Sequence, residues 1–589
     1  MRAESLSAQS RQTALEDLAA TTPEAPLDVL VVGGGVVGTA AAFDAATRGL
    51  RVGLVEAQDL AQGTSSRSSR LVHGGLRYLQ MLDFKLVAEA LRERDLLLKH
   101  TAPHLVRALP FVFPFEKRVV DRAFIGSGVS LYDAMSMRPG EKRPVPFHRH
   151  LSRTRLRQRF RGLRDDKFIG ALEYYDAQVD DARLVLTLGR SAHSLGAHVV
   201  TRTEVLEYLR AGEGDDAAGP ASEEAPVIGV VARDRETGDR LEIHARETIL
   251  ASGVWTGQQQ ETAHVSSGLE VLASKGIHIT VPKDRIPADD HVGVITQTEK
   301  SVLFIIPMGE YWSIGTTDTA WHENISSPAP NSVDIDYVLD HVNDVLEADL
   351  TRNDVIGTWA GLRPLLQPVE VEESKSSKVS REHTVMRLAP GLSAVAGGKL
   401  TTYRVMAEDA VSFVLGDRQV HRESLTHAMP LLGGQGFSEW ESRAPEISST
   451  YGWSDTTVDR LLNRYGSLLG EVLALVDEHP ELGEEVPHAA GHLGVEFAYA
   501  AISEGALHME DLIERRTRLF HEVRDRGVAA MDDIVAIVAP LLQWNETTAA
   551  REKEAFSRIA EAHIAAESST TDAEAAALVA AATPDYISQ

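Results

Sequence analysis

The sequence contains no cysteine among its 589 residues. This absence excludes disulfide bonds, thiolate metal ligands, redox-active thiols and any covalent cofactor link through a cysteine sulfur. Long apolar segments are also lacking: no apolar run reaches the roughly 18 residues that a membrane-spanning helix requires. The first 26 residues are polar and carry two arginines without an apolar core, so no secretory signal is expected there.

Positive charge is scarce overall, with 59 Lys and Arg against 86 Asp and Glu and a formal net charge of −27. A general nucleic-acid binder is therefore disfavoured, because phosphates would be repelled on average. Residues 138–164 depart from this acidity, with ten Lys or Arg and a single acid, Glu141. Such a stretch could contact anionic lipid headgroups, at about 1 kcal/mol for each charge, or form a solvated or internally ion-paired face. The sequence leaves both interpretations open.

The length predicts two or three domains. We expect a flexible extension at 1–26, interleaved cofactor and substrate domains at 27–430, a helical domain at 431–565 and a flexible tail at 566–589. Within the helical domain, Glu514–Arg518 is expected to form a charged face. The acidic, low-complexity stretch 211–226 is expected to be an exposed loop.

The most informative stretch begins with Leu27–Val32, an apolar run typical of a buried parallel strand. Gly33, Gly35 and Gly38 follow as G-x-G-x-x-G, and Thr39–Thr47 is typical of a helix. The first glycine permits a tight turn, the second lets the backbone approach a pyrophosphate, and the third lets the helix pack close to the strand. The helix N-terminus would present free N–H groups to that pyrophosphate.

A second strand, Arg51–Val55, ends at Glu56, which is placed to accept hydrogen bonds from ribose hydroxyls. Glu56 follows Gly38 by 18 residues, close to the expected interval of roughly 20. A late strand runs into Gly253 and would return beside the first strand, which places this glycine near the cofactor. Strand, helix, second strand and terminal acid together predict a dinucleotide-binding unit.

Further strands are predicted beyond this unit. Val227–Arg233 and Arg240–Ala245 are typical of a β-hairpin. Ile277–Val281, Ser301–Pro307 and Tyr311–Thr316 favour a second, antiparallel layer. The expected fold class is therefore α/β: a Rossmann-type domain, an antiparallel-sheet substrate domain and an all-helical C-terminal domain.

Three more motifs accompany residues 33–56: TSSRSSRLVHGGLRY at 64–78, GLRPL at 361–365 and GGKLTTYR at 397–404. Together they resemble the FAD-dependent, respiratory type of glycerol-3-phosphate dehydrogenase, within the D-amino-acid-oxidase-like flavoproteins. The resemblance runs from about Asp28 to Arg518. The first motif marks only a dinucleotide fold, whereas the His-Gly-Gly-Leu-Arg-Tyr and Gly-Gly-Lys-Leu-Thr-Thr-Tyr-Arg pieces are much more specific.

The resemblance implies oxidation of sn-glycerol 3-phosphate to dihydroxyacetone phosphate, with hydride passing to flavin N5 and electrons then reaching a membrane quinone. FAD would be bound noncovalently by parts at about 27–80, 180–255 and 355–415; a histidyl link stays open. The expected location is cytoplasmic, with peripheral contact on the inner face of the cell membrane. A homodimer is a further expectation.

Oxidising a secondary alcohol also requires a base and cations. His73 is the best candidate base, because imidazole titrates near neutrality. Arg363 and Lys399 are implied as the catalytic cations; Pro364 would keep the Arg363 backbone extended. An isolated histidine or cation is more often structural, and it is the matching motifs that favour these roles. The substrate-binding residues implied are Arg77, Tyr78, His278 and Arg381.

Cofactor contacts are expected from the glycine motif, the serine-rich loop and the turn at 397–402. The serines could line the diphosphate or form an ordinary flexible loop. Arg70 stands where related sequences often carry lysine, and the residues around Gly253 depart slightly from the usual pattern. The cofactor-binding residues expected are Gly33, Gly35, Gly38, Glu56, Ser65, Ser66, Ser68, Gly253, Gly398, Lys399, Leu400 and Thr401, and no metal site is expected.

Three alternatives remain open on the sequence. The same half-reaction could pass electrons to O2, as in a glycerol-3-phosphate oxidase. A flavin amine or amino-acid oxidase would use the same fold, although several cations argue for a phosphate-bearing substrate. A non-enzymatic flavin-bearing or membrane-docking protein would need none of these side chains.

Overall fold

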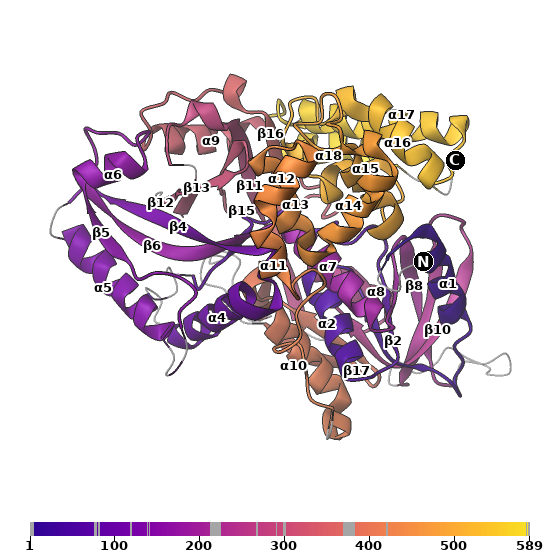
Figure 1. Cartoon of the computed structure of the whole chain (residues 1–589). Coiled ribbons are helices and arrows are strands. Elements are labelled where there is room, and N and C mark those ends of the chain that lie inside the picture. Colours follow the sequence, from indigo (N-terminus) through magenta and orange to yellow (C-terminus); the bar gives the residue numbers. More distant parts are fainter. Residues whose placement is uncertain are drawn as a thin grey trace.

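The computed structural model describes residues 5–75, 79, 83–117, 120–137, 140, 142–212, 225–266, 269–289, 291–297, 302–368, 383–419, 422–584 and 586. Most of the expected loop at 211–226 lies outside this set. Figure 1 shows one sheet at the lower right, a second sheet on the left and a group of helices above them. The expected α/β fold class with a helical C-terminal region is confirmed.

The first sheet is built around β1 (Leu27–Val32), which pairs in parallel with β10 (Arg240–Leu250) and β2 (Val52–Val55). Alternate β1 side chains enter different cores, because successive residues of a strand point to opposite faces. Val29 and Val31 pack with the helices of one face, and Leu30 with the other face. The remaining strands of this sheet are β7 (His198–Val200), β8 (Thr203–Arg210), β9 (Val227–Asp234), β17 (Thr384–Ala389) and β18 (Leu392–Ala396).

Three helices cover one face of this sheet: α2 (Val36–Thr47), α7 (Asp181–Ser194) and α10 (Tyr403–Leu415). The predicted hairpin is confirmed as antiparallel β9 and β10. α2 begins directly after the glycine turn, so its N-terminus points toward the end of β1. A short helix, α8 (Thr256–Thr262), follows β10.

The N-terminal segment forms a docked helix, α1 (Ala8–Ala19). Ser7 and Ser10 form a reciprocal N-terminal cap, and Leu15 and Leu18 are buried against the first sheet. The expectation of a flexible extension is therefore wrong for residues 5–26, because burial of these leucines offsets the entropy of ordering the segment.

The second sheet is mainly antiparallel and follows the order β15, β11, β14, β13, β12, β4, β6, β3, with β16 on β11 and β5 on β6. Its α9 helix (Ser332–Asn343) packs on alternate buried residues of β11. The strand bounds are β3 Leu71–Val72, β4 Val106–Phe115, β5 Arg149–Ser152, β6 Gly170–Val179, β11 Leu269–Pro282, β12 Gly293–Gln297, β13 Val302–Met308, β14 Tyr311–Gly315, β15 Thr319–Ala320 and β16 Gly357–Pro368.

The position of β16 corrects one expected boundary. Residues 355–415 were expected to be a single cofactor-binding part, yet β16 pairs with β11 along its whole length in the second sheet. The cofactor sheet resumes only at β17. Three further helices flank the second sheet: α4 (Phe84–Leu96), α5 (Val120–Met135) and α6 (Arg153–Arg159).

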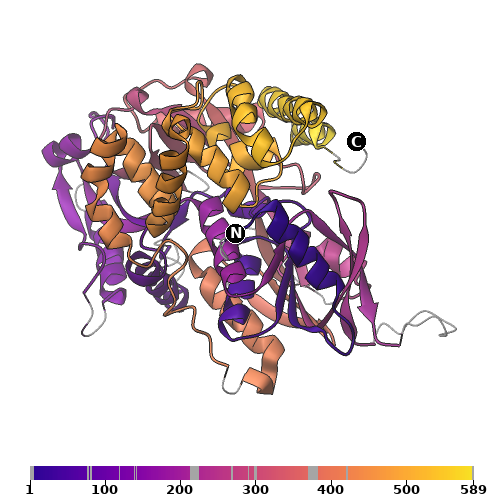
Figure 2. The ribbon, with the colours of Figure 1, turned by 45° about the vertical axis from the view of Figure 1, so that its right-hand side comes forward.

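The C-terminal helices lie across both sheets (Figure 2). Their bounds are α11 Phe437–Ser442, α12 Ala444–Tyr451, α13 Asp455–Tyr465, α14 Leu469–Glu478, α15 Gly494–Ser503, α16 Met531–Leu541, α17 Glu546–Ala566 and α18 Asp572–Ala582. Within the described ranges, no helix combines the length and the apolar composition that a membrane crossing requires.

One expectation about this region is wrong. The tail at 566–589 is not flexible over 566–582, because α18 buries Ala576 among Val254, Trp321 and Leu362. The charged face expected at Glu514–Arg518 is buried. Its arginines point inward and pair with Asp59, in a loop of the first sheet, and with Asp181, the first residue of α7.

Candidate cofactor and substrate site

A cavity of about 920 Å³ is lined by residues from both sheets. Its walls include the ends of β1, β2 and β18 from the first sheet and parts of β11, β13 and β16 from the second. It therefore lies at the carboxyl ends of the parallel strands, where open α/β sheets bind ligands. Gly33, Gly35 and Glu56 line it together with His73 and Arg363.

The glycine motif has the geometry that a dinucleotide requires. Gly33 has φ of 114°, and a Cβ there would lie 2.6 Å from the Ala251 carbonyl oxygen. Gly38 does not line the cavity; a Cβ on it would lie 1.9 Å from the Gly33 carbonyl oxygen, so its role is close helix–strand packing. Glu56 accepts hydrogen bonds from the backbone N–H of Gly34 at 2.6 Å and of Gln58 at 2.8 Å. Burial raises the pKa of the Glu56 carboxyl.

The serine loop joins this motif to the rest of the cavity. Ser65 lines the cavity, and its Oγ accepts a hydrogen bond from the N–H of Val36, the first residue of α2, at 3.0 Å. Ser68 also lines the cavity, while its N–H and Oγ donate to Asp181 at 2.9 and 2.7 Å. Ser66, by contrast, does not line the cavity: its buried side chain turns back toward the Gly63 carbonyl oxygen at 3.4 Å.

The turn at 397–402 forms another wall, and Gly398, Lys399, Leu400 and Thr401 all line the cavity. Thr401 Oγ1 accepts from the His73 N–H at 3.0 Å and donates to the His73 carbonyl oxygen at 3.2 Å. These two bonds fix the backbone of His73 against the segment that carries Lys399. His73 and Lys399 are far apart in the sequence, but these hydrogen bonds join their two segments at the wall of the same cavity.

Arg363 extends from β16 beside β11. Its Nη2 donates to Thr316 Oγ1 at 3.0 Å and to the Thr317 carbonyl oxygen at 3.1 Å, and its Nη1 lies 3.3 Å from Asp318 Oδ1. Gly276 makes room for it, since a Cβ there would lie 2.3 Å from Nη2. The guanidinium is thereby held at the cavity wall, where it can bind an oxyanion.

His278 lies on β11 and is 2% exposed. Its ring stacks on Trp359 with centroids 4.9 Å apart, and its Nε2 is 3.0 Å from Ser69 Oγ. Burial, reinforced by the positive charges of Arg363 and Arg70, lowers the pKa of His278 to about 3. The imidazole is therefore neutral near pH 7 and is a weaker base than an exposed histidine.

Sequence reasoning named Ser69, among the serines that could line the diphosphate, and Arg70, but it missed Trp359 and the contacts that these residues make around His278. Trp359 stacks on it, Ser69 contacts its Nε2, and the Arg70 guanidinium lies 4.8 Å from the Trp359 ring. Arg70 also donates to Tyr311 Oη at 2.9 Å. Their proximity to the recognised motifs was the available signal, since Ser69 and Arg70 directly follow Ser68 and Trp359 lies two residues before Gly361.

Gly253 has φ of 56° and lines the cavity at the turn after β10. The predicted substrate residues Arg77, Tyr78 and Arg381 lie outside the described residues. Of the predicted catalytic residues, His73, Arg363 and Lys399 all line the one cavity, as does His278.

The residues present fit FAD. A pyrophosphate can sit against the Gly33–Gly35 backbone and the start of α2 without a side chain in its way, and Glu56 can meet a ribose. The turn at 397–401 and the cationic end with Arg363 would then lie toward the flavin ring and the substrate. When bound, FAD supplies the acceptor for two electrons.

Comparisons with known proteins agree with this geometry. The family described as FAD dependent oxidoreductase matches residues 28–404, and the C-terminal domain of alpha-glycerophosphate oxidase matches residues 424–549. Glycerol-3-phosphate dehydrogenase 2 of Mycobacterium tuberculosis is 45% identical over 556 residues, which cover 94% of this chain and 92% of the relative. The mitochondrial glycerol-3-phosphate dehydrogenase of Mus musculus is 32% identical and is matched over 91% of this chain and 73% of its own length.

A solved structure gives the same result. The glycerol-3-phosphate dehydrogenase from Bacillus halodurans, complexed with FAD, superposes with a TM-score of 0.74 and 27% identity, covering 95% of this chain and 98% of that one. The match includes both sheets and the helical region, because it extends over nearly the whole of both chains. The chain therefore belongs to the glycerol-3-phosphate dehydrogenases of the FAD-dependent oxidoreductase family.

Proposed function

We propose that this protein oxidises sn-glycerol 3-phosphate to dihydroxyacetone phosphate, using noncovalently bound FAD. The observation that carries this proposal is the single cavity that joins a dinucleotide cradle to Arg363, Lys399 and two imidazoles. The cations suit a phosphate-bearing substrate better than an amine or amino acid. The names of the curated relatives support the same substrate.

Each side chain has a distinct role in the proposed reaction. Oxidation of the secondary alcohol removes the C2 hydrogen with its electron pair and, separately, the hydroxyl proton. We propose that His73 accepts the proton, while Arg363 and Lys399 hold the substrate anion. The two hydrogen bonds between Thr401 Oγ1 and the His73 backbone, one accepted and one donated by the hydroxyl, hold the backbone of His73 at the cavity wall.

His278 is the alternative proton acceptor in the same cavity. It is neutral near pH 7 and lies in the same cavity, but burial and the cations Arg363 and Arg70 lower its pKa to about 3, which makes it a weaker base and favours His73. The two assignments predict different variants to fail. Under His73 catalysis, His73→Asn slows anaerobic flavin bleaching far more than His278→Asn does; the reverse order assigns the proton to His278.

The main test is anaerobic mixing of the flavin-loaded protein with sn-glycerol 3-phosphate. Rapid loss of flavin absorbance near 450 nm, an approximate wavelength for a bound oxidised flavin, is expected. An unchanged spectrum with flavin present would contradict the proposal. Amines and amino acids serve as controls and should leave the spectrum oxidised.

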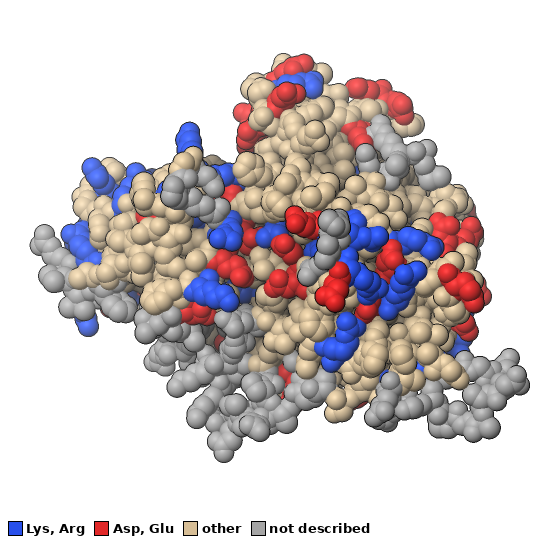
Figure 3. Space-filling view, turned by 90° about the horizontal axis from the view of Figure 1, so that it is seen from below, with Lys and Arg blue, Asp and Glu red and all other residues tan. Residues whose placement is uncertain are grey.

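We also propose a quinone as the electron acceptor, reached by peripheral contact with a membrane. Exposed apolar side chains support a contact surface near the basic stretch: Leu131, Met137 and Phe147 are 42%, 56% and 56% exposed. Lys and Arg predominate at the left-hand end of the face in Figure 3, the end at which α5 and α6 lie in Figure 1. Near the middle of that face, positive and negative side chains are interspersed.

Much of the basic stretch is ion-paired within the protein, so charge is the smaller part of this argument. The pairs are Arg143–Asp133, Arg149–Glu173, Arg153–Asp165, Arg157–Asp165, Arg159–Glu173, Arg159–Asp289 and Arg164–Asp166. The apolar side chains are therefore the sharper target. Met137→Ser with Phe147→Ser should weaken sedimentation with anionic vesicles, whereas Val333→Ser, at an exposed site on α9, should not.

The acceptor itself is tested by turnover. A quinone-linked enzyme should reduce a soluble quinone analogue quickly and form little hydrogen peroxide in air. Peroxide formed in a one-to-one ratio with product would instead assign the chain as an oxidase and contradict the quinone proposal.

A further inference from the structure

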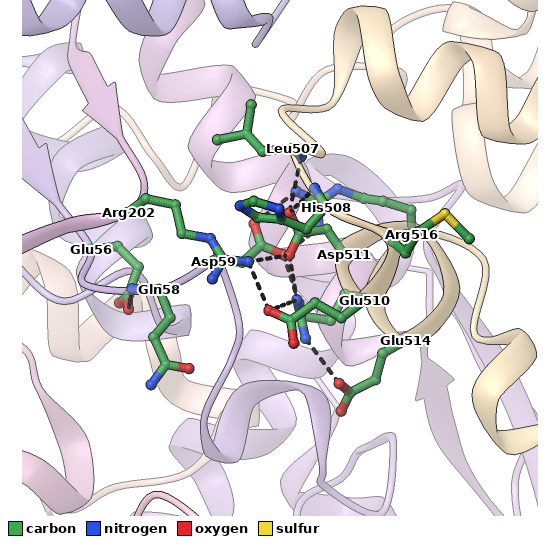
Figure 4. Close-up of polar contacts among 12 residues, drawn as sticks. Glu56, Gln58, Asp59, Arg202, Leu507, His508, Glu510, Asp511, Glu514 and Arg516 are labelled. Atoms are coloured by element: carbon green, nitrogen blue, oxygen red, sulfur yellow. Dashed lines mark hydrogen bonds and ion pairs between the residues drawn. The ribbon is translucent and has the colours of Figure 1, made fainter. Parts of the chain in front are cut away.

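A cluster of buried charges joins the helical domain to the loops beside the cavity. Figure 4 shows Asp59 and Arg202, from the first sheet's loops, among charged side chains of the segment 507–516. Asp59 and Asp511 are each 1% exposed. Buried charges are costly unless they are paired, so this arrangement requires the two parts to meet in one relative position.

Asp59 is held by two successive arginines of the helical domain. Arg515 Nε donates to its Oδ2 at 2.6 Å, and Arg516 makes a bidentate pair with its two oxygens at 2.6 and 2.8 Å. Asp59 directly follows Gln58, which lines the cavity with Glu56. The helical domain thus holds the backbone three residues after Glu56, the predicted ribose-binding residue.

Arg518 makes a second connection, to the serine loop itself. Its Nη2 donates to the Ser66 carbonyl oxygen at 3.0 Å and to Asp181 Oδ1. Asp181 is fully buried, and its other oxygen accepts the N–H and Oγ of Ser68. One guanidinium therefore holds two residues of the loop, one directly and one through a carboxylate.

Arg67, in the serine loop, makes a third connection to the helical domain. It lines the cavity, and its Nη2 donates to Glu514 Oε1 at 3.1 Å. Three consecutive residues, 66 to 68, are thus held by the helical domain or by a carboxylate that it contacts. The adjacent Ser65 supports the start of α2 and Ser69 supports His278, so displacement of this segment would disturb both ends of the cavity.

We propose that Arg518 is a positioning residue through which the helical domain fixes loop 65–69 in the shape that binds FAD. A guanidinium is required because its three nitrogens face different groups: Nη2 donates to the Ser66 carbonyl oxygen and to Asp181, Nη1 donates to the Glu514 carbonyl oxygen at 3.4 Å, and Nε lies 3.3 Å from Asp180 Oδ1. The single nitrogen of a lysine ammonium cannot reach all of these groups. The inference concerns cofactor binding by the apoprotein, so it does not depend on which substrate the holoenzyme oxidises.

The test compares Arg518→Lys with Arg460→Lys as the matched control. Arg460 also pairs with a buried carboxylate, Glu496, at 2.9 Å and donates to the Gly491 carbonyl oxygen at 2.7 Å, although its own side chain is 26% exposed. Both of these partners lie within the helical domain. For Arg518→Lys we expect the Kd for FAD to rise by about tenfold, the loss of one charged hydrogen bond. Hydrogen–deuterium exchange of the apoprotein should accelerate at the amides of residues 66–70.

The control separates positioning from simple stability. Arg460→Lys should lower the thermal unfolding temperature without changing the Kd for FAD or the exchange of residues 66–70. If Arg518→Lys behaves like this control, with the unchanged Kd and exchange, the proposal is overturned.

A second variant covers the case in which Arg518→Lys fails to fold. Ser68→Ala removes only the loop's hydroxyl donor to Asp181 and should raise both the Kd and the exchange rate by a smaller factor. In the double variant that combines Arg518→Lys with Ser68→Ala, the further rise in Kd caused by Arg518→Lys should be smaller than in the wild-type background. Part of the Arg518 effect acts through Ser68, which this variant has already changed. The connection through Asp181 would be refuted if Ser68→Ala had the wild-type Kd for FAD and the wild-type exchange rate. It would also be refuted if the fold-change in Kd of the double variant equalled the product of the two single fold-changes.

Discussion

The cavity and the junction with the helical domain each bury a histidine, with opposite results. In the cavity, His278 has the cations Arg363 and Arg70 near it, and its pKa is lowered to about 3. At the junction, His508 lies between Glu236 Oε1 and Glu552 Oε1, each 3.0 Å from a ring nitrogen, and its pKa is raised to about 9. Burial lowers the pKa in both cases, so the neighbouring charges decide the outcome.

The geometry alone leads to the same assignment. An imidazole whose two nitrogens both face carboxylate oxygens must donate from both, which requires the charged form. His492, between Glu496 and Glu522, repeats this arrangement, and its pKa is raised as well. At the junction, the charged His508 therefore connects the helical domain to Glu236 of the first sheet, whereas the cavity holds a neutral imidazole, His278.

The largest expected effect comes from removing a cation on the cavity side. Arg363→Gln should lower kcat/KM for sn-glycerol 3-phosphate by about 10³-fold, since an oxyanion-binding group is lost. The flavin spectrum should be retained. Arg285→Gln, which breaks an exposed ion pair with Asp354, is the control and should leave kcat/KM unchanged. A loss below tenfold in Arg363→Gln would remove this residue from the proposed site.

At the junction, the corresponding change is Asp59→Asn. It leaves Arg515 and Arg516 buried without their shared carboxylate and should cost about 3–5 kcal/mol of stability. Urea unfolding measures this loss. Asp336→Asn, which breaks the exposed pair with Arg352, should cost no more than about 1 kcal/mol. Equal losses in the two variants would show that burial of the pair has no consequence.

The pH dependence of stability tests the charged histidine directly. Because the pKa of His508 is raised on folding, its contribution is fully present below about pH 6.5 and is lost as the pH rises through about 9. The contribution should be about 3 kcal/mol. We expect wild-type protein to lose more stability than His508→Gln between pH 6.5 and 10. His479→Gln, at an exposed site, should follow the wild-type curve.

The smallest expected effect concerns the hydroxyl beside His278. Ser69→Ala should reduce kcat/KM by about three- to tenfold, the value of one neutral hydrogen bond. Because His278 is neutral above about pH 3, its titration should contribute no limb to the kcat/KM profile between pH 5 and 8. A limb in that range that disappears in His278→Asn would show that the imidazole is protonated in the free enzyme.

Local patterns predicted much of the cavity. The strand, glycine turn and helix at 27–47 are confirmed, and His73, His278, Arg363 and Lys399 all reach the same cavity. The sequence could place these residues together because each lies in short-range geometry or in a motif matched residue by residue, while their catalytic and binding roles stay predictions. The direction of the Ser66 side chain could not be predicted, because within a serine-rich loop it depends on what packs against it.

The corrections at the two ends of the chain share one cause, and the burial of Glu514–Arg518 has the same origin. The composition of residues 5–26 and of α18 is polar, acidic or alanine-rich and predicted flexible ends, and the composition of Glu514–Arg518 gave no sign that it is buried. Each is buried by contact with a part of the chain that is hundreds of residues away, such as Arg516 with Asp59. Composition reports the average preference of a residue type and carries no information about a distant partner.

The sequence alone therefore determined the dinucleotide unit, the fold class and several of the residues that line the cavity, since these depend on local turns, periodicity and matched motifs. Tertiary structure alone decided which charges are buried and which histidine is charged. The physical reason is that a pKa or an ion pair depends on the distance to an opposite charge, and here that distance is set by packing of the helical domain on the cavity loops.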